Sequence, residues 1–237
     1  MSFHDKVAMV AGGTGGLGRA VSLALLEAGA SVVTTYRRRE EYDALRSAAG
    51  AAAANLSGAT VDVTDEAAVK KFAEGIEARH GRLDILVNTV GGYAGGKNVW
   101  EADAKIYQQM LDLNLRSGFV LARAVLPAMI RQNRGWIVNI ASKAGYGHSP
   151  GAALYSASKA AALALFDSLA DEVKGYAIQV NSVVPSIFDT EANRKAMPKA
   201  DFSKWPKPEE IARVVLFLCS EDARVVHGAA IPVYGRT

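Results

Sequence analysis

Two residues placed four positions apart, Tyr155 and Lys159, could carry proton-transfer chemistry in this chain. They lie at the start of an alanine-rich stretch that predicts a helix. Four residues make just over one helical turn, so both side chains leave the same face. A lysine ammonium beside a phenol favours the phenolate, which predicts a Tyr155 pKa lowered towards neutrality. Such a phenol could both donate and accept a proton.

The pair is not specific by itself, because a chain with eight tyrosines would contain one such spacing by chance roughly half the time. Two further features strengthen it. Ser142 ends an apolar run thirteen residues before Tyr155. A glycine-rich segment near the start of the chain indicates a site for a phosphate-bearing cofactor.

The glycine-rich segment Ala11–Gly18 follows the apolar run Val7–Ala11 and opens the first long helical stretch. Gly12, Gly16 and Gly18 have the useful spacing, because glycine lets the backbone approach a pyrophosphate closely. The start of the helix adds free N–H groups and the positive end of its dipole. Strand, glycine turn and helix in this order predict a dinucleotide site.

The residues after the second apolar run bear on the choice of dinucleotide. A cofactor without a 2′-phosphate is usually held there by an acidic residue, and none stands at Thr35 or Tyr36. Arg37, Arg38 and Arg39 follow at once, and guanidinium groups bind a phosphate through paired hydrogen bonds. This predicts NADP, with NAD still possible, and the alternative is a solvated basic helix start.

Composition excludes several classes of protein. A chain of 237 residues is long enough for one α/β domain with a large core. The net charge is only +3 and most basic residues are dispersed, which argues against nucleic acid binding. No apolar run reaches the roughly 18 residues that span a bilayer, and no secretory signal opens the chain. With Cys219 as the only cysteine, we expect a cytoplasmic protein that binds no membrane.

Short apolar runs alternate with longer amphipathic stretches along the chain. Strands are predicted at Val7–Ala11, Ser31–Tyr36, Thr60–Asp62, Leu83–Asn88, Trp136–Ala141, Ile178–Val184 and Ala229–Val233. Helices are predicted near residues 16–29, 38–49, 65–80, 101–132, 152–174 and 208–220. The alternation predicts a single α/β domain over residues 1–237, with a doubly wound parallel sheet of seven strands covered by helices on both faces.

Taken together, these motifs resemble the short-chain dehydrogenase/reductase family over nearly the whole chain. Asn114, Ser142, Tyr155 and Lys159 match the family's catalytic tetrad. The resemblance implies a Rossmann fold with strand order 3-2-1-4-5-6-7 and no metal. The cofactor contacts that it implies are Gly12, Thr14, Gly15, Gly16, Leu17, Gly18, Arg37, Arg38, Asp62, Val63, Asn88, Val90, Gly91, Tyr155, Lys159, Pro185, Ile187 and Thr190.

The resemblance also implies the reaction, which is NADP(H)-dependent hydride transfer between nicotinamide and a carbonyl or alcohol, as in 3-oxoacyl or ketone reductases. Tyr155 would donate a proton to the substrate oxygen, and Ser142 would orient that oxygen. Lys159 would lower the Tyr155 pKa and hold the nicotinamide ribose, while Asn114 would steady a water. A homotetramer is expected, with a dimer second, because the family commonly forms tetramers and the helix carrying Tyr155 has small side chains.

The chain departs from the family pattern at several positions. Thr89 and Val90 stand in place of Asn and Ala, and Ser186 replaces the glycine after Pro185. Segment 189–205 is similar to quinonoid dihydropteridine reductases, which gives an alternative substrate. A second alternative is a catalytically inactive protein that senses a dinucleotide. Three aromatic residues, Tyr93, Tyr146 and Trp205, could stack on a flat substrate or simply cover the cleft.

Overall fold

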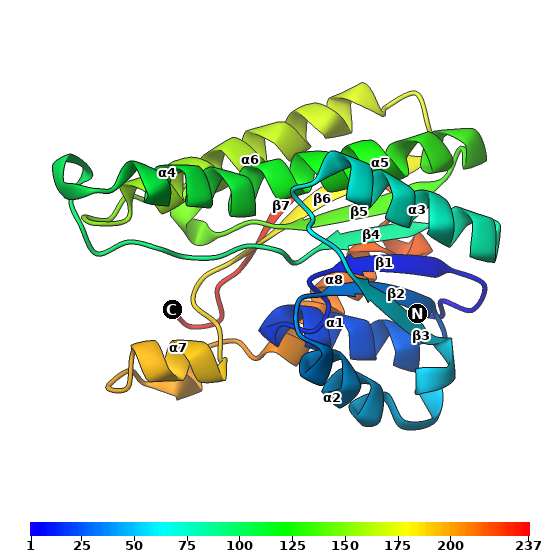
Figure 1. Cartoon of the computed structure of the whole chain (residues 1–237), viewed down its shortest axis with the longest axis horizontal. Coiled ribbons are helices and arrows are strands. Elements are labelled where there is room, and N and C mark those ends of the chain that lie inside the picture. The colour runs from blue at the N-terminus through cyan, green and yellow to red at the C-terminus, as the bar shows by residue number, and fades with distance from the viewer.

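Seven parallel strands form one sheet in the order β3-β2-β1-β4-β5-β6-β7 in this computed structural model, which describes residues 1–237 (Figure 1). The strands are β1 Val7–Ala11, β2 Ser31–Tyr36, β3 Leu56–Thr60, β4 Ile85–Asn88, β5 Gly135–Ile140, β6 Ile178–Pro185 and β7 Ala230–Val233. Every neighbouring pair is parallel. The predicted strand order and fold class are therefore confirmed.

Helices cover both faces of this sheet, which explains why a strand such as β1 is apolar and buried at every position. The helices are α1 Gly16–Glu27, α2 Arg39–Ala49, α3 Glu66–His80, α4 Ala104–Leu111, α5 Ser117–Gln132, α6 Ala153–Glu172, α7 Glu191–Ala196 and α8 Pro208–Leu218. Figure 1 shows α1, α2 and α8 on one face and α3 to α6 on the other. Each face packs its own apolar core.

Two predicted elements differ from the structure, and one helix was not predicted. The third strand lies at Leu56–Thr60, because this edge strand is half exposed and its small side chains lack the apolar signal used to find Thr60–Asp62. The predicted helix 101–132 starts later and contains a π turn at Asp112–Arg116. The short helix α7 was not predicted at all, since its residues are exposed and mostly polar.

By length and composition alone, the helical run Ala104–Gln132 would qualify as a membrane span. Half of its most apolar window is buried inside the protein. Its outer face carries arginines that pair with carboxylates of α3, namely Arg123 with Glu66 and Arg131 with Glu77. A helix packed in this way forms part of the protein core.

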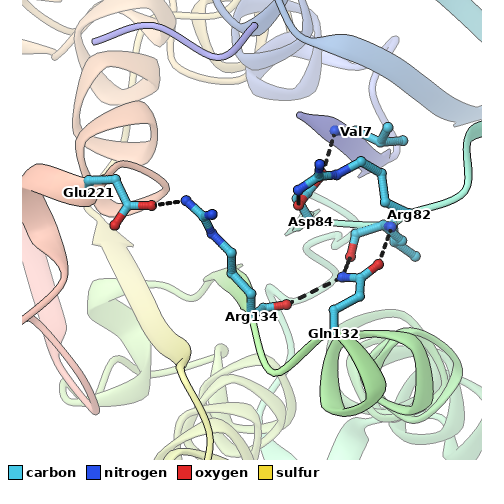
Figure 2. A network of polar contacts seen from close by, with 7 residues as sticks. Val7, Arg82, Asp84, Gln132, Arg134 and Glu221 are labelled. Atoms are coloured by element: carbon cyan, nitrogen blue, oxygen red, sulfur yellow. Dashed lines mark hydrogen bonds and ion pairs between the residues drawn. The ribbon is translucent and has the colours of Figure 1, made fainter. Parts of the chain in front are cut away.

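A polar network ties together the ends of β1 and β4 at the N-terminal edge of the sheet (Figure 2). The fully buried Asp84 accepts a hydrogen bond from the Val7 N–H at 2.9 Å and two from the Arg82 guanidinium at 2.6 and 2.8 Å. Gln132 bonds both backbone groups of Leu83 at 3.0 Å. Asp84 therefore joins two strands, at the edge opposite the carboxyl ends where α/β sheets bind ligands.

Candidate active site

The four predicted catalytic residues gather at the carboxyl ends of β4 and β5. Ser142 follows β5 and caps the next turn, its Oγ accepting a hydrogen bond from the Ala144 N–H at 3.2 Å. Tyr155 and Lys159 project from the first turns of α6. The buried Lys159 amine donates to the Ile140 carbonyl at 3.1 Å. This bond ties α6 to the end of β5 beside Ser142.

Asn114 lies in the π turn, which widens the helix by one residue and turns this amide toward the loop after β4. Its Nδ2 donates to the Gly92 carbonyl and to Ser158 Oγ, both at 3.0 Å, and its Oδ1 accepts from the Gly92 N–H at 3.0 Å. Both N–H groups of the amide are therefore used within the protein. Asn114 Oδ1 keeps one lone pair, so a water beside Lys159 could donate to it but could not accept from this amide.

Because Gly91 has no side chain, the loop after β4 can lie close to both Asn114 and Lys159. A Cβ at this position would lie 3.0 Å from Asn114 Oδ1 and 3.1 Å from Lys159 Nζ. Such contacts are tighter than side chains normally make, so any larger residue would displace the amide or the amine. Asn114 and Lys159, far apart in sequence, therefore share one wall of the site.

Burial sets the acidity of the two central groups. It raises the pKa of the Tyr155 phenol, and a hydrogen bond with the Ser142 side chain lowers it in part. Burial lowers the pKa of the Lys159 amine to about 8. The predicted lowering of the Tyr155 pKa by Lys159 is wrong for this structure. The shared helix face does bring the two residues together, but the amine bonds to Ile140.

The glycine turn has the backbone that a pyrophosphate site needs. Gly12 adopts a left-handed φ of 72°, and its N–H donates to Thr35 Oγ1 at 2.9 Å. Thr89, one of the departures from the family pattern, donates to the Ala11 carbonyl at 2.7 Å. Gly15 begins α1 without any side-chain cap, so the first N–H groups of the helix remain available to an anion. The turn fits a dinucleotide phosphate.

We expect Gly18→Ala to destabilise the unliganded protein by about 1–3 kcal/mol, because its Cβ would lie 2.2 Å from the Gly12 carbonyl oxygen. Gly15→Ala is the matched control, since φ is −71° there and the nearest atom is 3.5 Å away. Urea unfolding without cofactor measures both variants. Equal losses of stability would show that close packing of the turn is not the cause.

The two arginines after β2 that are predicted to contact the cofactor differ in their partners. Arg38 forms an ion pair with Glu41, and this contact holds the pKa of the Glu41 carboxyl below its usual value. Glu41 also accepts a hydrogen bond from the Thr14 hydroxyl at 3.1 Å. Arg37 is exposed and makes no hydrogen bond or ion pair, so it alone of the two predicted arginines is free to meet a phosphate.

The remaining predicted cofactor residues line the same edge of the sheet. Asp62 accepts hydrogen bonds from the N–H and hydroxyl of Thr64 and holds the turn after β3, with Val63 buried beside it. Asn88 donates to Asn139 at 3.0 Å and accepts from the Val90 N–H at 3.2 Å. These contacts fix the backbone that leads to Gly91.

The segment after β6 crosses to the glycine turn. Pro185 ends β6 and Ile187 follows, half-buried. Thr190 caps α7 and lies so close to α1 that a Cβ on Gly16 would be 2.9 Å from Thr190 Cγ2. Leu17, the next residue of α1, is buried. The structure therefore brings together Thr190 and the glycine turn, both of which are predicted to contact the cofactor.

Of the three aromatic residues, only Tyr93 contacts a predicted catalytic residue. Its ring meets the Tyr155 ring edge to face, with centroids 5.1 Å apart and planes at 81°. Tyr146 is exposed, whereas Trp205 is buried against Phe202. Trp205 is thus occupied as apolar cover and is not free to stack on a substrate.

Sequence reasoning missed three residues that support the site. Thr89 holds the glycine turn, Ser158 accepts from Asn114, and Glu41 bridges Thr14 and Arg38. Thr89 carried a signal, since it departs from the family pattern at a loop position. Ser158 and Glu41 carried none, because a serine or glutamate on a helix is ordinary.

Comparison with known proteins agrees with this geometry. A family model described as short chain dehydrogenase matches residues 6–201. The chain is 30% identical to the 3-oxoacyl-[acyl-carrier-protein] reductase FabG of Thermotoga maritima, over 99% of this chain and 98% of the relative.

Two solved structures carry different cofactors in their names. ElxO with NADP bound superposes with a TM-score of 0.91 at 27% identity, covering 97% of both chains. NAD+-bound xylitol dehydrogenase gives a TM-score of 0.90 at 26% identity, covering 99% of this chain and all of its own. Because the family model matches most of this chain, the chain belongs to the short-chain dehydrogenase/reductase family and is an oxidoreductase acting on CH–OH or C=O groups.

Proposed function

We propose that this protein is an NADP(H)-dependent carbonyl reductase, of the kind that acts on 3-oxoacyl groups or ketones, using Ser142, Tyr155, Lys159 and Asn114. The observation that carries the proposal is the meeting of these residues at the end of β5. A hydrogen bond with Ser142 lowers the pKa of the Tyr155 phenol in part. The buried Lys159 amine donates to the carbonyl of Ile140, the last residue of β5. A tetrad intact at all positions disfavours a catalytically inactive sensor.

In the reducing direction, Tyr155 would donate its proton to the oxygen of the substrate. A phenol whose pKa is raised by burial stays protonated at neutral pH, which suits a proton donor. Ser142 Oγ already accepts a hydrogen bond from the Ala144 N–H, so its single O–H proton would turn from the Tyr155 phenol to the same substrate oxygen when substrate binds. The Lys159 ammonium, close to Gly91, would add positive charge on the cofactor side.

When bound, NADP(H) would supply or accept the hydride. The glycine turn and the start of α1 would hold its pyrophosphate, and Arg37 would hold its 2′-phosphate. Lys159 would bond the nicotinamide ribose, and Thr190 would bond the carboxamide. The NADP-bound structure supports NADP as the cofactor. Because another similar structure binds NAD+, the argument for NADP depends on the residues after β2.

Arg37→Ala should raise the KM for NADPH about tenfold and leave the KM for NADH unchanged, because a charge-assisted hydrogen bond contributes about 1.5–3 kcal/mol. Arg46→Ala, another exposed arginine without an ion pair on α2, is the matched control. Initial rates with both cofactors give the comparison. A similar change for NADH and NADPH would place Arg37 outside the 2′-phosphate site.

The test of the proposed function is a set of initial rates with NADPH and NADH. The panel contains 3-oxoacyl thioesters, simple ketones and a quinonoid dihydropterin. We expect NADPH-dependent reduction of at least one carbonyl. Turnover restricted to the dihydropterin would support the alternative substrate. NADPH binding with no turnover at all would support the dinucleotide-sensing alternative.

We also propose a homotetramer, with a dimer second. The outer face of α6 is lined by small exposed residues, and α5 beside it exposes Phe119. The α6 residues are Ala153, Ala157, Ala160 and Ala164. Small side chains let helices of two subunits pack closely. Sedimentation should give a species well above the 25.1 kDa of one chain. The cytoplasmic location remains a prediction that rests on the single, buried Cys219.

A further inference from the structure

Ser186 makes contacts that the glycine usual at this position in the family could not make. Its hydroxyl donates to the Tyr234 carbonyl at 3.0 Å, and its Oγ accepts from the Thr237 hydroxyl at 2.6 Å. Ser186 directly follows Pro185, at the exit from β6. The segment Tyr234–Thr237 is therefore attached to the start of the loop that carries Thr190.

The same segment is attached to the far end of that loop. The Arg236 N–H donates to the Lys204 carbonyl and the Arg236 guanidinium donates to the Ser203 carbonyl, both at 3.1 Å. Gly235 has a left-handed φ of 61°, and a Cβ there would lie 2.9 Å from Pro206. Figure 1 shows this end of the chain beside the segment that leads from β6 to α7.

A third contact reaches the catalytic loop. Lys143, the residue after Ser142, lies over the Tyr234 ring at 4.8 Å and directs its amine to the Thr237 carbonyl at 3.5 Å. The Tyr234 ring also packs on a small buried cluster of Ala141, Leu163 and Val184. One short segment thus contacts the exit of β6, the end of the loop and the residue beside Ser142.

Residues 191–199 of the loop itself have few anchors. Most of these side chains are exposed, and the ion pairs among them lie on the surface, where such pairs contribute little. A backbone bond from the Asp189 N–H to the Pro206 carbonyl, at 2.9 Å, closes the loop at its base. The position of Thr190 over Gly16 therefore depends on the packing of Phe188 against the core and on what holds residues 186 and 203–206.

We propose that Ser186 and the segment Tyr234–Thr237 form a latch that holds loop 187–206 against the Ser142 loop, which makes Ser186 a positioning residue for the carbonyl substrate. The inference rests on the proposed function, because it assigns the loop to the substrate side of that site. The latch touches no predicted catalytic atom. Its loss should therefore weaken substrate binding more than the chemical step.

Ser186→Ala and Thr237→Val each remove one hydroxyl and little volume. Each should raise the KM of the best carbonyl substrate about fivefold to tenfold, the value of one hydrogen bond, with kcat within about twofold. The Kd for NADPH should rise less than this KM, because Thr190 is one of many proposed cofactor contacts. The loss in the double variant should be smaller than the sum of the two single losses, because both single variants already lose the bond between the two hydroxyls. Ser186→Thr should keep the wild-type KM, because threonine retains the hydroxyl. Ser31→Ala, a serine at the start of β2 with no side-chain hydrogen bond, is the control.

Hydrogen exchange gives a readout that needs no activity. Both single variants should speed exchange in residues 187–206 and leave α1 and α6 unchanged. Unchanged exchange in that loop would overturn the latch even in a fully active enzyme. Additive losses, or equal falls in kcat and kcat/KM, would also overturn it. A wild-type protein without carbonyl turnover would instead remove the proposed function, and the exchange result would still decide whether the latch exists.

Discussion

Replacing Tyr155 with Phe will lower kcat for carbonyl reduction by about 10²–10⁴-fold and leave the affinity for NADPH within about threefold. The range is the usual contribution of a positioned proton donor. Phenylalanine keeps the ring, so the edge-to-face contact with Tyr93 and the packing of α6 survive. Only the hydroxyl, which is the proposed proton donor, is lost. Single-turnover kinetics and NADPH titration by fluorescence measure the two quantities.

Tyr176→Phe is the matched control for this change, because Tyr176 is exposed between α6 and β6. It should leave kcat unchanged. A Tyr155→Phe enzyme that kept more than a tenth of its activity would refute the assignment of the proton donor. A large loss of NADPH affinity would mean that the phenol acts mainly through the cofactor.

The second large effect concerns Lys159, whose replacement by Met should remove activity and at the same time stabilise the fold at neutral pH. Burial lowers the pKa of this amine from 10.5 to about 8, which corresponds to roughly 3 kcal/mol of folding free energy. Methionine has a similar length and no charge to desolvate. Losing the bond to the Ile140 carbonyl costs about 1–2 kcal/mol. We therefore expect a net gain of about 1–2 kcal/mol at pH 7.

The gain should depend on pH in a defined direction. Below pH 8 the amine is protonated in both the folded and the unfolded protein, so the full cost of burial is present. Between pH 8 and 10.5 the unfolded chain binds more protons than the folded one, and wild-type stability rises with pH. The advantage of Lys159→Met should consequently shrink over this window.

Urea unfolding of both proteins from pH 6.5 to pH 10.5 checks this expectation. Lys174→Met, on an exposed lysine that pairs with Asp171, is the control and should show no such trend. A constant difference between wild type and Lys159→Met across the window would mean that folding does not change the pKa of this amine. A less stable Lys159→Met protein at pH 7 would mean that the amine stabilises the fold.

Much of the architecture was predictable from local patterns. Continuous apolar runs such as Val7–Ala11 specify strands buried on both faces, and their alternation with amphipathic stretches specifies a parallel sheet. The glycine turn could be placed because glycine is needed at Gly12 for its backbone and at Gly18 for space. The edge strand Leu56–Thr60 escaped, since a half-exposed strand carries little apolar signal.

The sequence by itself determined the family, the strand order that the family implies, and which residue types could exchange a proton. Only the tertiary structure decided how deeply those groups are buried and which hydrogen bonds they make. The Lys159 amine points toward the Ile140 carbonyl, to which it donates a hydrogen bond. This contact between α6 and β5 cannot be predicted from the spacing of residues along the chain. The π turn at Asn114 and the contacts of Ser186 likewise depend on segments distant in the chain. Local patterns follow from neighbouring residues, whereas burial and bond direction depend on the whole packed chain.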